Sequence, residues 1–362
     1  MFALLGSVLT HGLVPAIVAP ALLPPPRSAA PGVAAPRIAE TRTYKIRQTV
    51  SLNEIPATAK EVRLWVPVPA DGSWQHVLDR RVVEAPAGWT LVHQPACNAD
   101  MVVATAKGAA GTATVVVETT VVRESPAFDL SEPTQGELQP ALFAADTRTD
   151  APLMSADAKV SELATRACAG ETDPRRKVVK LLDAVADAAD HYSKDATKPQ
   201  CGRGAAEDCL TNGGGCCTDL HSLFIAAARQ QGIPARLQFG YRLKADKENT
   251  DYDPSYRCWV EYFLPGSGWV PTDIVVADAG EATARAGNYG TLDARRVWLW
   301  QGRGLELTPK QSGAPIQTML CGWAEIDGEP VDVLPGADGK PSKLRRSIRF
   351  QDLTPKAVAA AK

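Results

Sequence analysis

Cys217 is the residue whose type and setting best fit nucleophilic chemistry. It follows three glycines, Gly213–Gly215, at the point where the spacing of Leu220, Leu223 and Phe224 predicts that a helix begins. A helix N-terminus carries about half a positive charge and unpaired N–H groups, which favour a thiolate and can receive the oxyanion of an attacked carbonyl. We therefore expect a reactive thiol with a lowered pKa. The alternative is a cysteine that merely packs as a small apolar side chain.

The segments around this cysteine carry a family resemblance. Residues 215–224 (GCCTDLHSLF) and 228–236 (ARQQGIPAR) resemble the cysteine motif of the transglutaminase-like superfamily. Residues 258–273 (CWVEYFLPGSGWVPTD) look like the second motif of that family. The match is dense over residues 212–274 and weak elsewhere. The resemblance implies an α+β class protein with a papain-like transglutaminase core, acting on protein or peptide amides.

The resemblance also implies a Cys-His-Asp triad. In such a triad the cysteine attacks the amide carbonyl, a histidine on a strand takes and returns the proton, and an acidic residue on the next strand orients the imidazole. Cys217 matches the nucleophile and Asp273 matches the acidic member. The histidine position, directly before Cys258, is occupied by Arg257.

Arg257 cannot serve as the missing base, because arginine stays protonated in proteins. No histidine follows position 221, so no other alignment supplies one. We expect Arg257 to stabilise a Cys217 thiolate and to pair with Asp273. General acid–base catalysis contributes about 10²–10⁴-fold, and its loss predicts low or absent amide turnover.

His221 is a substitute base to consider. It lies four residues after Cys217 and therefore on the same face of the predicted helix. Helical side chains lean toward the N-terminus, which tips His221 toward the thiol. The alternative is a packing residue that supports the site. We assign no role to the remaining histidines.

The cysteines do not predict a metal centre. Cys201, Cys209, Cys216 and Cys217 lack a C-x-x-C spacing, and adjacent cysteines rarely bind one ion well. A local disulfide between Cys201 and Cys209 would suit an exported protein. No motif indicates a nucleotide, haem or flavin, and no calcium loop is visible. We therefore expect no cofactor.

The chain divides by pattern into five parts. Alternating apolar residues with turn signals every few residues are typical of an antiparallel sandwich, and helical spacing followed by strand-like runs is typical of an α+β domain. The predicted parts are a signal peptide and linker at 1–40, a β-sandwich at 41–125, a connector at 126–152, a transglutaminase-like domain at 153–310 and a short β-containing C-terminal segment at 311–362.

Within the α+β part, local signals predict three helices. The first starts after Ser155, the second has Asp173 as its N-cap with Pro174 at its first position, and the third begins near Cys217. Three strands follow, at residues 235–243, 257–264 and 268–274, and weaker ones are expected at 297–300, 322–326 and 347–350.

Composition limits the partners and the compartment. Lys and Arg number 39 against 41 Asp and Glu, a net charge of -2 that gives no electrostatic case for nucleic acid or an anionic membrane. Residues 2–23 are mostly apolar and are followed by small residues, as in a secretory signal. We expect a periplasmic or secreted protein, with an uncleaved N-terminal anchor as the alternative and no later membrane span. Oligomeric state is not indicated.

Two functions remain open from the sequence. The first is a pseudoenzyme, in which Cys217 and Asp273 line a cleft that binds peptides with little or no turnover. The second is an active cysteine peptidase, amidase or acyltransferase that uses His221 or another group as its base. The replaced histidine favours the first, and the retained Cys217 and Asp273 favour the second.

Overall fold

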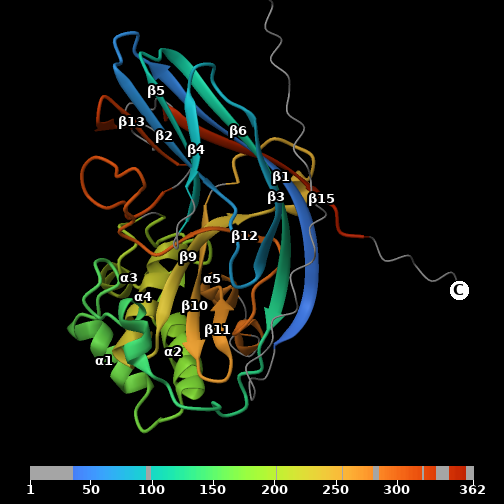
Figure 1. Ribbon diagram of the computed structural model, residues 1–362. Coiled ribbons are helices and arrows are strands. Elements are labelled where there is room, and N and C mark those ends of the chain that lie inside the picture. Colours follow the sequence, from blue (N-terminus) through green and yellow to red (C-terminus); the bar gives the residue numbers. More distant parts are fainter. Residues whose placement is uncertain are drawn as a thin grey trace, which may run out of the picture.

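The computed structural model describes residues 36–94, 99–200, 202–254, 256–279, 285–319, 322–331 and 342–355. Two layers of antiparallel strands stand above a mixed helical and sheet region, and the strands β9, β10 and β12 lie where the two regions meet (Figure 1). The prediction of an α+β protein with an antiparallel sandwich is confirmed.

The sandwich consists of two sheets. One sheet has the strand order β15-β1-β6-β3 and the other has the order β14-β13-β2-β5-β4. Their strands are β1 (Arg37–Ile55), β2 (Glu61–Val68), β3 (Gln75–Glu84), β4 (Thr90–Gln94), β5 (Asp100–Lys107), β6 (Gly111–Ala127), β13 (Trp323–Ile326), β14 (Glu329–Pro330) and β15 (Leu344–Asp352). Alternating buried and exposed positions along β1, as at Val50 and Leu52, turn one face of the strand into the core.

The C-terminal strands belong to this sandwich. β15 pairs with β1 over nine residues, from Leu52↔Leu344 to Tyr44↔Asp352. β13 pairs with β2, placing Trp323 opposite Trp65. The sequence-based boundaries stay predictions, but the segment expected at 311–362 supplies strands to the region expected at 41–125. The sandwich is thus built from both ends of the described chain.

Within the described residues, the helical region contains four α-helices of seven residues or more and several shorter elements. The helices are α1 (Ala158–Ala167), α2 (Pro174–Ala188), α3 (Ala206–Asn212) and α4 (Cys217–Gln230). The prediction for α2 is confirmed, since Asp173 accepts a hydrogen bond from the Arg176 N–H and Pro174 begins the helix. The N-cap of α1 is Asp157 rather than the predicted Ser155. α3 was not predicted, because Gly213 closes it after only two turns.

A further four-stranded sheet, separate from the two sheets of the sandwich, lies against these helices with the order β11-β10-β9-β12. Its strands are β9 (Ala235–Arg242), β10 (Arg257–Leu264), β11 (Gly268–Thr272) and β12 (Arg296–Gln301). The remaining elements are η1 (Pro140–Asp146), β7 (Asp190–His191), β8 (Gly214–Gly215), η2 (Ala245–Lys247), α5 (Ile274–Asp278) and η3 (Ala286–Asn288). The three main strands expected after α4 are therefore present, although β11 ends at Thr272 so that Asp273 caps α5.

Helix α4 is the centre of the helical region. Every residue from Thr218 to Arg229 is buried, with α1, α2 and α3 packed against it and β9 and β10 beside it. Phe224 of α4 meets Tyr262 of β10 with ring centroids 5.9 Å apart. This packing holds the N-terminus of α4 against the start of β10.

Candidate functional site

A glycine loop positions the N-terminus of α4. Gly214 and Gly215 pair in parallel with Asp190 and His191, and Gly214 has a φ of +150°. A Cβ on Gly214 would lie 2.1 Å from the Asp190 carbonyl oxygen, so a side chain there would break the pairing. The glycines therefore allow the close backbone approach that fixes where Cys217 stands.

Cys217 is the first residue of α4, as predicted. Its side chain is half-buried, whereas its neighbour Cys216 is buried. The buried carboxylate of Asp219 accepts the Cys216 N–H at 2.9 Å, which caps the helix from within its first turn. The Cys217 thiol is thus held at a helix mouth with partial access to solvent.

The pKa of Cys217 differs from the sequence-based expectation. The Cys216 thiol lowers the pKa of Cys217, but the Cys258 thiol, burial and the charge of Asp273 raise it, and the net shift is upward. The expectation of a lowered pKa is therefore wrong. A helix N-terminus supplies only partial charge, and the interaction with the Cys258 thiol, together with desolvation and the Asp273 charge, outweighs it.

His221 lies one turn further along α4 and is fully buried. Its Nδ1 lies 3.2 Å from the Sγ of Cys258, and its Nε2 accepts the Ile274 N–H at 3.2 Å. Because an N–H can donate only to an unprotonated nitrogen, this arrangement puts the hydrogen on Nδ1, from which it donates to Cys258. The thiol that His221 contacts is therefore on β10, not at the helix mouth.

Asp273 contacts the same imidazole. Its Oδ1 lies 3.4 Å from Nε2 of His221 and accepts the Val275 N–H at 3.0 Å. Its Oδ2 forms an ion pair with the buried guanidinium of Arg296. Burial by itself would raise the pKa of Asp273, but the charge of Arg296, helped by the Val275 N–H, outweighs it and holds the pKa well below its usual range.

Arg257 does not take the place expected for it. Asp273 pairs with Arg296 of β12, and within the described residues no ion pair of at most 4.0 Å joins it to Arg257. Arg257 is half-buried, and its Nη1 donates to the Tyr256 carbonyl oxygen at 3.0 Å. The expected Arg257–Asp273 pair is therefore wrong, because the carboxylate faces β12 and α4 instead.

Three residues of this site escaped sequence reasoning: Cys258, Tyr256 and Arg296. Tyr256 places its hydroxyl 3.1 Å from the Thr218 hydroxyl, beside Cys217. For Cys258 the only signal in the sequence is that it directly follows residue 257, the position expected for the histidine. Arg296 had none, because only the pairing of β12 with β9 brings it near.

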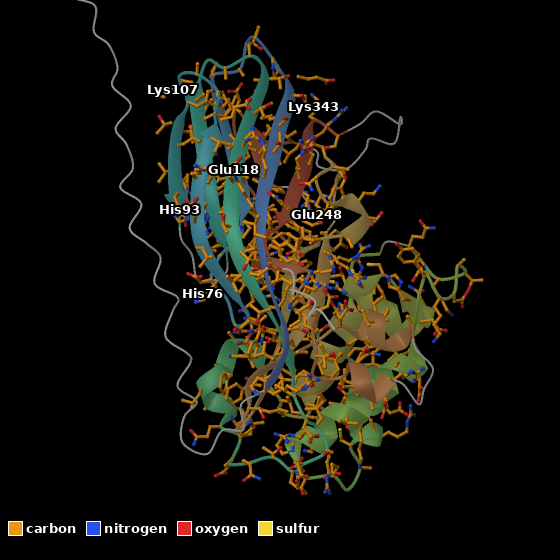
Figure 2. The ribbon with its side chains drawn as sticks, turned by 90° about the vertical axis from the view of Figure 1, so that its right-hand side faces the viewer. His76, His93, Lys107, Glu118, Glu248 and Lys343 are labelled. Carbon is orange, nitrogen blue, oxygen red and sulfur yellow. The ribbon has the colours of Figure 1, made fainter. Side chains whose placement is uncertain are left out.

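The other cysteines and histidines form no second centre in the part of the chain that the structure describes. Cys168, Cys209, Cys216, Cys217 and Cys258 are free thiols, and no three metal-ligating side chains gather within those residues. Cys201, the other half of the suggested disulfide, lies outside the described residues. His76 and His93 lie on strands of the sandwich, His93 higher up and His76 near the lower end of the sandwich (Figure 2).

Comparison with known proteins supports the family resemblance of the central segment. Residues 161–274 match the family model of the transglutaminase-like superfamily, and this range contains α4, β9 and β10 and reaches from α1 to the first residue of α5. This segment of the chain is therefore similar to the transglutaminase-like superfamily. The match also contains Cys217, His221, Arg257 and Asp273.

Individual relatives are more distant. An uncharacterized protein of Haemophilus influenzae is 29% identical over 216 residues, covering 50% of this chain and 56% of that protein. The chain thus spans little more than half the length of this curated relative.

Among solved structures, a candidate cysteine protease of Cytophaga hutchinsonii is 17% identical with a TM-score of 0.53, covering 86% of this chain and 99% of that one. At this identity the likeness shows only that the two chains share a fold. The periplasmic domain of TgpA from Pseudomonas aeruginosa is 16% identical with a TM-score of 0.32, covering 70% and 95% of the two chains. A TM-score of that size supports no further conclusion.

None of the helices in the described ranges is long and apolar enough to cross a bilayer. The predicted signal peptide and linker together span residues 1–40. Residues 1–35 lie outside the described residues, and β1 already begins at Arg37, within the range expected for the linker. Export to the periplasm or beyond, or retention by an N-terminal anchor, stays a prediction.

Proposed function

We propose that this protein presents a transglutaminase-like thiol cleft to protein or peptide amides and turns them over slowly or not at all. One observation supports this above the others: the imidazole that Asp273 orients contacts Cys258, while Cys217 is the accessible thiol. With arginine at position 257, the thiol at the helix mouth has no base of suitable pKa among its direct partners. The protein would bind an amide against Cys217 without completing acyl transfer efficiently.

The test is restoration of the family residue. Arg257→His should raise amide hydrolysis or amine incorporation by about 10²–10⁴-fold over the natural protein. Arg257→Gln is the matched control, since it removes the charge without supplying a base, and it should not raise turnover. A natural protein that already turns over as fast as Arg257→His would contradict the proposal.

A second candidate function is an active enzyme in which His221 is the base. The observation that favours it is the continuity from Asp273 to His221 to Cys258, which interacts in turn with Cys217. If the hydrogen of His221 moves to Nε2 and donates to Asp273, Nδ1 can accept the Cys258 proton while Cys258 accepts the Cys217 proton. The Cys217 sulfur then attacks the amide carbonyl. As the C–N bond breaks, one proton passes back from His221 through Cys258 to the leaving amine.

This second candidate is tested by interrupting the relay. His221→Gln and Cys258→Ala should each abolish turnover, whereas Cys258→Ser should retain part of it because a hydroxyl can still pass a proton. Turnover that survives Cys258→Ala would exclude the relay. Turnover that is undetectable in the natural protein but appears in Arg257→His would decide for the slow or inactive cleft.

A further inference from the structure

A buried hollow lies on the other face of the β9–β10–β12 sheet, between that sheet and the sandwich. Arg123 of β6 lines it from the sandwich side, together with the turn before β3. Arg236, Gln238, Glu261 and Trp298 line it from the sheet side. The cavity volume of the hollow is about 30 Å³, and the hollow opens to solvent on one side. Because Tyr262 packs toward α4, alternation along β10 directs Glu261 away from the thiol site.

The charges around this hollow do not balance. Glu261 uses one oxygen, Oε2, to accept from Arg236 Nη2 at 2.7 Å, from Arg236 Nε at 3.0 Å and from Gln238 Nε2 at 2.9 Å. Arg123 is only 2% exposed, and within the described residues no carboxylate lies within 4.0 Å of it. Burial lowers the pKa of Arg123 to about 10, which leaves it charged at neutral pH. Among the residues that line the hollow, two guanidinium groups therefore accompany a single carboxylate, and the more distant carboxylates of Asp293 and Glu124 also act on Arg123.

The hydrogen-bonding groups show the same excess. Arg123 Nε, Arg123 Nη2 and Trp298 Nε1 are buried N–H donors without a partner in the described part of the chain, whereas Gln238 Oε1 is the unpaired acceptor beside them. Buried polar groups in folded proteins are nearly always satisfied. Moreover, Nε and Nη2 are the two adjacent donors with which an arginine grips a carboxylate side-on. A bound group with two acceptor oxygens and a negative charge would satisfy them.

We propose that this hollow is a binding site for a small carboxylate, held side-on by Arg123 and contacted by the Trp298 indole N–H. The carboxylate would join the sandwich to the sheet, because Arg123 and Trp298 belong to the two different regions. The source is either a free small carboxylic acid or the terminal carboxylate of a peptide. The inference does not depend on the thiol chemistry, since it concerns the opposite face of the sheet.

Titration with sodium acetate tests this directly. The tryptophan fluorescence of the full chain should respond saturably to acetate at constant ionic strength, and isothermal titration should give the same dissociation constant. Acetamide, the neutral molecule of the same shape, should give no saturable response. No saturable acetate response up to about 100 mM, or an equal response to acetamide, would overturn the proposal.

Two variants locate the binding. Arg123→Lys keeps the charge but loses the side-on pair and should weaken acetate binding by about tenfold or more. Trp298→Phe keeps an aromatic side chain but loses the indole N–H, and it should weaken acetate binding several-fold. This variant tests the site even if Arg123→Lys fails to fold. Acetate affinity unchanged in Trp298→Phe and in a folded Arg123→Lys would refute the site. N-acetylglycine binding tighter than acetate would identify a peptide terminus, and acetate binding without it would identify a free acid.

Discussion

The two faces of the β9–β10 ladder carry different chemistry on alternating residues. On the face toward α4, Cys258 meets the imidazole of His221, and nearby the carboxylate of Asp273 has a paired cation in Arg296. On the face toward the sandwich, Glu261 pairs with Arg236, while two N–H groups of the buried Arg123 have no hydrogen-bond partner in the described residues. The charged groups on the first face are therefore paired with one another, whereas the second face has N–H donors left over.

The difference follows from what packs against each face. Helix α4 contributes His221 and the free thiol of Cys217. Strand β6 of the sandwich contributes the buried Arg123, which forms no ion pair of at most 4.0 Å with a carboxylate of the described residues. The comparison teaches that a family motif read along one strand mixes two sites. Trp259 and Glu261 line the hollow toward the sandwich, whereas residues 258, 260 and 262 alternate with them and face the helix.

The largest expected effect breaks the paired charges on the face toward α4. Asp273→Ala leaves Arg296 buried without its main partner, and we expect the free energy of unfolding to fall by about 3–5 kcal/mol. Asp293→Ala is the matched control, since Asp293 lies 3.4 Å from the same guanidinium but is partly exposed, and it should cost about 1 kcal/mol or less. Urea denaturation measures both. Equal losses would show that Asp273 is not the principal counter-charge.

Acid should reveal the same pair. The folded pKa of Asp273 lies below its ordinary value, so its ionisation contributes stability that is complete above about pH 4 and is lost as the pH falls through the lowered pKa. The difference in unfolding free energy between the natural protein and Asp273→Asn should therefore shrink between about pH 5 and pH 2. Denaturation midpoints at each pH measure it. A difference that stays constant would mean that the carboxylate is not stabilised by the fold.

Thiol reactivity should change by a smaller factor. Cys258 contributes to the raised pKa of Cys217, so Cys258→Ala should lower that pKa and speed alkylation of Cys217 by iodoacetamide several-fold near neutral pH. Mass spectrometry of the labelled peptide against pH measures it. Cys209→Ala, which removes a thiol that is also fully buried but lies on α3, should leave the rate unchanged. An unchanged alkylation rate in Cys258→Ala would show that the Cys258 thiol does not affect the pKa of Cys217.

The smallest expected effect concerns Tyr256. Tyr256→Phe removes the hydrogen bond to the Thr218 hydroxyl and should cost about 0.5–1.5 kcal/mol. A double-mutant cycle with Thr218→Val isolates the pair, because the two losses should not add. Fully additive losses in unfolding free energy would show that the two hydroxyl groups do not interact.

Local signals predicted the elements that their own residues determine. Asp173 with Pro174 located the start of α2, and Cys217 stood at the first residue of α4 as expected. β10 has the bounds that its apolar run indicated. The helix α3 was missed because it is only seven residues long, and a helix this short has little periodicity of its own.

The partners of the site could not be predicted in the same way. Spacing placed His221 on the same side of the helix as Cys217, but its contact with Cys258 depends on how β10 packs against α4. Arg296 displaced Arg257 as the partner of Asp273 because the pairing of β12 with β9 brings it there. Neither contact has a local sequence pattern.

By itself, the sequence determined the resemblance of residues 161–274 to the transglutaminase-like superfamily, the thiol at a helix start, and the arginine at the position where that resemblance expects a histidine, because these depend on residue type and spacing along the chain. The tertiary structure alone decided which thiol the histidine meets, which cation holds Asp273, and that strands from both ends of the chain form one sandwich. The physical reason is that side-chain contacts and ion pairs depend on distances in space, which only sheet pairing and helix packing set.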